Sequence, residues 1–108
     1  MSHCTVDDVE AIVDTDMGPN IIQSLIEEVD ALIAMKLTVS GVATNVLRAI
    51  SRTWTAYRVM LKDPAAQSRE GETDNRTENL RHLKAMYMEM LADASGGIAF
   101  TMTSSPIE

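Results

Sequence analysis

The sequence is poor in residue types and patterns that several classes of protein require. It has one cysteine, Cys4, which excludes an internal disulfide and is typical of a reducing compartment. No apolar stretch approaches the roughly 20 residues of a membrane span, and the N-terminus lacks the basic and apolar regions of a signal peptide. With 108 residues, 45% of them apolar, the chain is expected to be one small globular domain without a membrane segment.

The sequence also lacks the motifs on which common enzymes depend. It has no glycine-rich phosphate loop, and no serine or cysteine with a base visible at motif spacing. The run Asp14-x-Asp16-x-Gly18 resembles the start of an EF-hand loop. However, the sixth position is not glycine, and Leu25 stands at the twelfth, where glutamate is required. We therefore predict no enzyme activity, no cofactor and no bound metal.

Three further potential metal ligands are His3, Cys4 and His82. They would form a site only if the fold brought them together. Residues so close to a chain end are expected to be solvated, and His82 falls on the polar side of a predicted helix. These three residues are therefore weak support for a metal or redox protein, which we rank below the two functions considered at the end of this section.

The charged residues are distributed unevenly along the chain. Residues 1–35 contain eight acids and no Lys or Arg, whereas residues 36–62 contain five bases and no acid. The net charge of −7 argues against non-specific binding to nucleic acid or to an anionic membrane. An acidic and a basic region on one chain favour head-to-tail contacts between copies.

Apolar residues at helical spacing predict four helices. Thr5 is a plausible N-cap for the first, whose apolar face consists of Val6, Val9, Ile12 and Val13. The second helix begins at Pro19, the third follows a break at residues 38–41 and ends at Asp63-Pro64, and the fourth begins near residues 74–77. Residues 63–76 contain no large apolar side chain and are expected to form a long solvated loop.

Residues 96–108 have a different pattern. Gly96-Gly97 closes the last helical pattern, and larger apolar side chains then alternate, which is the period of a strand. A lone strand needs a partner for its backbone groups, and adding a strand to another protein is a known mode of recognition. We predict a helical domain at residues 1–95 and a docking tail at residues 96–108. The tail residues expected to contact a partner are Ile98, Phe100, Met102 and Ile107.

The predicted fold class is all-α: a small bundle of four helices with a long polar loop before the last helix and an extended C-terminal tail. Contacts between copies are expected to join the outward face of the second helix, with Glu27 and Asp30, to the polar face of the third, with Arg48 and Arg52. Met88 falls off the apolar stripe of the fourth helix and is assigned to the same contacts.

Several of these segments resemble the head–tail connector proteins of tailed viruses, also called adaptor or head-completion proteins. Residues 5–12 (TVDDVEAI) resemble the short first helix of that family, and residues 19–33 its long acidic second helix. Residues 52–57 (RTWTAY) resemble the aromatic and Thr-Ala segment of its third helix, although family members often have His where this chain has Tyr57. A polar loop, a fourth helix and an extended tail follow in the same order.

The resemblance implies a structural protein of the virion, located at the junction of capsid and tail after assembly in the host cytoplasm. Such proteins form a ring, typically dodecameric, that extends the DNA channel beneath the portal and carries the tail or stopper protein. The implied partners are the portal protein, which residues 96–108 would contact, neighbouring copies in the ring, and the tail or stopper; DNA passes as cargo. The alternative is a small acidic regulatory helical domain, such as an antitoxin or a repressor accessory subunit, in which the tail has no particular role.

Overall fold

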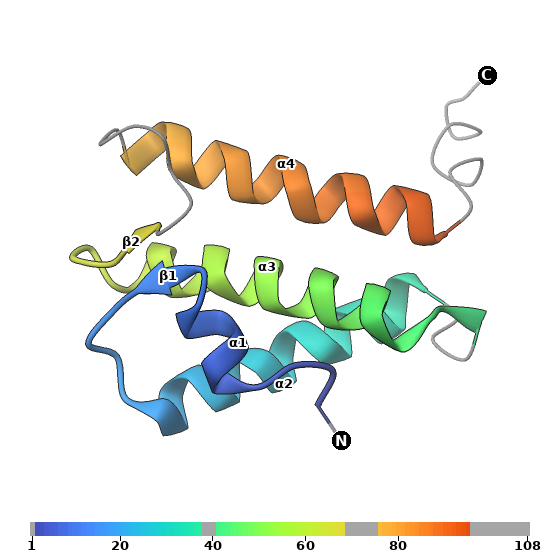
Figure 1. Cartoon of the computed structure of the whole chain (residues 1–108), viewed down its shortest axis with the longest axis horizontal. Helices are drawn as coiled ribbons and strands as arrows, with labels where there is room; N and C mark the ends of the chain where they lie inside the picture. The colour runs from blue at the N-terminus through green and yellow to red at the C-terminus, as the bar shows by residue number, and fades with distance from the viewer. Residues whose placement is uncertain (1, 38–40, 69–75, 96–108) are drawn as a thin grey trace.

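The computed structural model describes residues 2–37, 41–68 and 76–95, and the predicted all-α class is confirmed. The docking tail and the central part of the polar loop lie outside the described residues. Within these ranges no helix is both long and apolar enough to cross a membrane. The elements are α1 (Val6–Glu10), β1 (Val13–Asp14), α2 (Pro19–Lys36), α3 (Thr44–Lys62), β2 (Gln67–Ser68) and α4 (Arg76–Ala94) (Figure 1).

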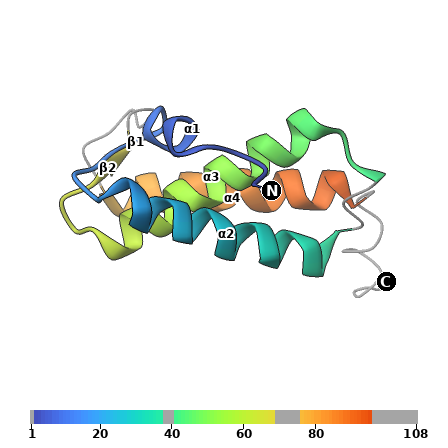
Figure 2. The same cartoon turned by 90° about the horizontal axis from the view of Figure 1, so that it is seen from below.

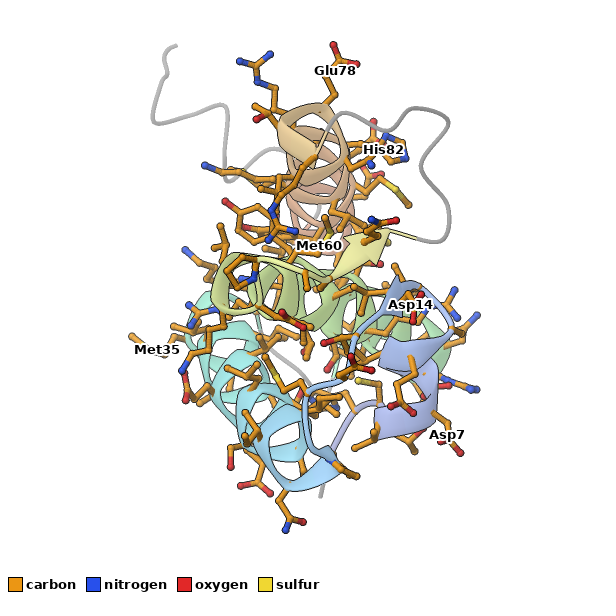
Figure 3. The ribbon with its side chains drawn as sticks, turned by 90° about the vertical axis from the view of Figure 1, so that its left-hand side faces the viewer. Asp7, Asp14, Met35, Met60, Glu78 and His82 are labelled. Atoms are coloured by element: carbon orange, nitrogen blue, oxygen red, sulfur yellow. The ribbon has the colours of Figure 1, made fainter. Side chains whose placement is uncertain are left out.

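Helix α3 is the centre of the molecule and contacts each of the other three helices. Helix α4 runs along one side of α3, while α1 and α2 lie on the other side (Figures 1 and 2). Seen along the long axis, α1 and α2 are side by side beneath α3 (Figure 3). Between these two sides α3 has two flanks. One flank lies between α4 and α2, and the other lies between α4 and α1 with the short strands.

The N-terminal residues are fixed to the helices. Thr5 caps α1 in a reciprocal box, in which its hydroxyl accepts from the Asp8 N–H and the Asp8 carboxylate accepts from the Thr5 N–H. The His3 N–H donates to Asp30 at 2.9 Å, and the Cys4 Sγ lies 3.2 Å from the Ser51 Oγ. Because the Cys4 side chain is only 4% exposed, the expectation of a solvated terminus is wrong.

Helix α1 is shorter than the apolar spacing predicts. It ends at Glu10, and Val13 instead pairs with Ser68 in a two-residue antiparallel ladder between β1 and β2. Residues 63–76 were expected to be solvated throughout, and this is wrong near their start, since Ala66 is completely buried. Val13 is completely buried in β1, as a residue on the apolar face of a helix would also be, so its spacing alone does not distinguish a helix from a strand.

The core consists of two clusters of buried side chains. The larger buried members of the first, near α1 and β1, are Val9, Ile12, Val13, Ile22, Leu25, Ile26, Val59, Met60 and Leu83. The second, at the other end of α3, contains Val29, Ile33, Leu37, Leu47, Ile50, Trp54, Tyr87 and Leu91. Tyr57 packs against both clusters and so connects the two halves of the bundle.

Candidate protein-binding surface

A groove of about 360 Å³ lies on the flank of α3 that is bordered by α2 and α4. Its apolar lining comes from all three helices: Leu25 of α2, Trp54, Tyr57 and Leu61 of α3, and Tyr87 of α4. Two cations, Arg58 and Lys62, complete the lining. The groove thus combines an apolar, aromatic wall with a positively charged edge.

The aromatic rings of the groove pack against one another. Trp54 and Tyr87 are stacked, with ring centroids 4.7 Å apart and planes within 5°. Tyr57 lies against Tyr87 at 5.6 Å in a tilted arrangement. Burial raises the pKa of Tyr87 above its ordinary value of 10.0, and the neighbouring Tyr57 adds to the shift, so this hydroxyl is neutral at physiological pH. Fixed aromatic side chains of this kind are the usual anchors of protein–protein contacts.

The charged edge is only partly neutralised within the chain. Arg58 forms a long ion pair of 3.5 Å with Glu28 across α2 and α3. Lys62 is exposed and makes no ion pair with any described residue. A partner with an acidic group would therefore find an available cation one helical turn beyond Arg58.

Four large apolar side chains of the described residues are exposed, and one of them, Leu61, belongs to the groove. Leu61 lines it and is 56% exposed, and Ile21, which precedes Leu25 by one turn of α2, is 52% exposed. Met35 is 82% exposed and projects from α2 on the side away from Asp7 and Asp14 (Figure 3). Met88, which follows Tyr87 on α4, is 52% exposed, in agreement with its predicted position off the apolar stripe.

Two of the charged residues assigned to contacts between copies are bound within the chain instead. Arg48 donates to both carboxylate oxygens of Asp8. Asp30 accepts a hydrogen bond of 2.6 Å from the Ser51 hydroxyl and another from the His3 N–H. The prediction that the Asp30 side chain lies on the outward face of α2 is therefore wrong. Asp30 lies at the edge of the apolar stripe of α2. Its hydrogen bonds to residues far away in the sequence show that its side chain turns toward α3 and the N-terminal residues.

The other residues assigned to contacts between copies form few interactions within the described part of the chain. Glu27 is exposed and, among the described residues, accepts only from Gln23, one turn earlier on α2, at 3.3 Å. Arg52 is exposed on α3 and forms no ion pair with the described part of the chain. These two residues and Met88 stay predicted contacts between copies. The four tail residues Ile98, Phe100, Met102 and Ile107 lie outside the described residues.

The structure gives no support to a metal site in the ranges it describes. Nowhere in them are three or more His, Cys, Asp or Glu side chains placed to hold a metal ion. Cys4 is buried near α3, whereas His82 is exposed on α4. In the EF-hand-like run, Thr15 donates to Asp63 at 2.5 Å and accepts from the Met17 N–H, and its turn leads directly into α2.

The groove itself was not predicted from the sequence. Trp54 and Tyr57 fall on the apolar stripe of α3 and Tyr87 on that of α4, and all three contribute to the core. The available signal was the occurrence of three of the four aromatic residues on two stripes, next to Arg58 and Lys62. Comparisons of the chain with models of protein families, with curated proteins and with solved structures found no match.

Proposed function

We propose that the chain is a structural subunit that acts by binding other protein chains, and specifically a head–tail connector of a tailed virus. The observation that supports this most strongly is the groove, in which the buried, stacked rings of Trp54 and Tyr87 are lined up with the exposed Leu61 and two cations. Apolar clefts with a charged rim are typical of interaction sites on proteins.

The more specific proposal comes from the resemblance to connector proteins. A short capped helix, a long acidic helix, a central helix with Trp54 and Tyr57, and a fourth helix occur in the expected order. In a ring, each copy would present one surface to the copy before it and another to the copy after it. Since Asp30 and Arg48 are bound internally, the proposed contact between copies rests on Glu27, Arg52 and Met88.

In this function residues 96–108 dock on the portal protein, with Ile98, Phe100, Met102 and Ile107 as the contact residues. The ring extends the DNA channel and carries the tail or stopper protein, at the capsid–tail junction of the virion. DNA is cargo rather than a ligand, because a net charge of −7 repels its phosphates.

Assembly measurements test this function. We expect native mass spectrometry and sedimentation to show the full chain binding as a ring to portal rings of the same virus. Changing Phe100→Ser together with Met102→Ser should abolish this binding, while Thr101→Ser with Thr103→Ser should not.

The contact between copies is tested by exchange of charge. Glu27→Lys or Arg52→Glu alone should weaken ring formation at low salt, and the two together should restore it. A chain that forms no ring on portal rings would contradict the connector function. A dimer that binds a promoter fragment would instead support the regulatory alternative.

A further inference from the structure

The groove has no occupant among the described residues, although its chemistry is that of a binding site for an extended apolar segment. Trp54, Tyr57 and Tyr87 form its aromatic wall, and Leu61 is more than half exposed beside them. We propose that the groove binds the C-terminal segment of the same chain, residues 96–108. This inference goes beyond the connector function and does not depend on it.

The side chains of this segment match the wall of the groove. In an extended chain, Ile98, Phe100 and Met102 project to one side, because successive side chains alternate. Phe100 would pack against the stacked pair of Trp54 and Tyr87, and aromatic pairs add attraction beyond their buried area. The Met102 thioether is equally suited to an aromatic wall.

The charges of the segment and the groove are also complementary. Residues 96–108 contain no Lys or Arg, and their one charged residue is an acid, Glu108. The groove carries Arg58, which has only a long ion pair with Glu28, and Lys62, which has none with the described residues. A segment with bases near its end would be repelled from this edge, whereas this segment is not.

The segment is long enough to reach along the whole groove. Helices α3 and α4 run in opposite directions, so a segment that turns back after α4 meets Tyr87 and Trp54 first, and then Arg58 and Lys62 (Figure 1). Ala94 is about 10 Å along α4 from Tyr87, and Lys62 is about 12 Å along α3 from Trp54, at 1.5 Å per helical residue. Thirteen extended residues span about 43 Å. The segment can therefore reach its own groove without a second copy.

Binding of the segment would cover apolar side chains that are otherwise exposed. It would also hold the proposed docking tail on its own helices, so that a partner has to compete with the groove for Ile98, Phe100 and Met102. A partner would then dock only if it binds residues 96–108 more tightly than the groove does.

The proposal is tested with a fluorescent label whose emission is quenched on contact with tryptophan. Trp54 is the only tryptophan of the chain, so quenching reports contact with this groove. Bimane is attached to the full chain at Met102→Cys, on the same side of the segment as Phe100, in a Cys4→Ser background. We expect emission to rise several-fold when Trp54→Phe is added. Phe100→Ser and the pair Arg58→Glu with Lys62→Glu should release the quenching to the same extent.

The matched control places bimane at Ala11→Cys, which is exposed at the end of α1, where Trp54→Phe should change nothing. Unchanged emission of the Met102 label after Trp54→Phe would overturn the proposal. Quenching that disappears on dilution would also overturn it, because the occupant would then be the tail of another copy. These measurements use no portal rings, so their outcome and that of the assembly test are independent.

Discussion

Arg48 holds Asp8 by two hydrogen bonds, with its Nε 3.0 Å from the Asp8 Oδ2 and its Nη2 on the Oδ1. This pair joins the centre of the fold to α1, which has only five residues and is too short to be stable alone. Hydrogen bonding to Arg48 lowers the pKa of Asp8 to about 2 from 3.8, against an opposing effect of burial, and the Thr5 N–H contributes further.

Replacing Arg48 should therefore weaken the attachment of α1 and make the weakening depend on pH. A carboxylate with a lowered pKa stabilises the fold above its unfolded pKa of 3.8, and this stability is lost as the pH falls through about 2. We expect Arg48→Gln to lower the free energy of unfolding only modestly at pH 7, because Arg48 is itself more than half exposed.

Urea unfolding followed by circular dichroism between pH 2 and pH 7 measures this difference, which should shrink steadily as the pH falls from 4 to 2. Arg52→Gln, one turn later on α3 and without an ion pair to the described residues, is the matched control and should leave the unfolding curve unchanged. Equal effects of the two substitutions would contradict the assigned role of the Asp8 pair.

Cys4 should be an unreactive thiol in the folded chain. Burial raises its pKa to about 11 from 9.0, despite the opposing effect of the hydrogen bond with Ser51. Only the thiolate reacts with disulfide reagents, so we expect labelling by Ellman's reagent at pH 8 to be slow until urea unfolds the chain. Because the folded pKa is the higher one, the stability from this group is complete below pH 9 and declines as the pH rises toward 11. Cys4→Ser should show less of this decline, and rapid labelling of the native chain would contradict the assignment.

Thr55 is completely buried, and its hydroxyl has no hydrogen-bond partner among the described residues. An unpaired buried hydroxyl is costly, whereas a methyl group of similar size is not. We expect Thr55→Val to raise the free energy of unfolding by ~1 kcal/mol. Thr15→Val is the contrasting variant, because the Thr15 hydroxyl binds both Asp63 and the Met17 N–H and its loss should be destabilising. Thermal unfolding of the two variants should shift in opposite directions.

Met35 and Met88 should matter for contacts with other chains rather than for the fold. Both are more than half exposed, so Met35→Ser and Met88→Ser should change the free energy of unfolding by less than ~0.5 kcal/mol. Ile33→Ala, at a completely buried site on the same helix as Met35, should cost about 3 kcal/mol and confirms the sensitivity of the measurement. A large loss of stability in either serine variant would place that methionine in the core.

The long helices could be predicted from the sequence because the residues that determine each helix are close together in the chain. The apolar stripes of the second, third and fourth helices follow the helical period, and Pro19 and Asp63-Pro64 mark a start and an end. Helix α1 was predicted too long because Val13 fits a helical stripe, while its actual partner, Ser68, is 55 positions away.

The interaction surface could be predicted only in part for the same reason. Met88 was correctly placed outside the core because its angle on the helix is a local property. Asp30 was misplaced because its partners, His3 and Ser51, come from separate segments. The groove depends on the positions of three helices relative to one another. The apolar stripe of one helix does not determine these positions.

The ladder between β1 and β2 has a consequence for the order of folding. It closes a loop that contains all of α2 and α3, and closing a long loop costs more chain entropy than forming the hairpin of those two helices. We therefore expect α2 and α3 to associate early and the pairing of Val13 with Ser68 to form after the main barrier. Val13→Ala should accordingly accelerate unfolding with little effect on the refolding rate, and a slowed refolding arm in stopped-flow measurements would reverse this order.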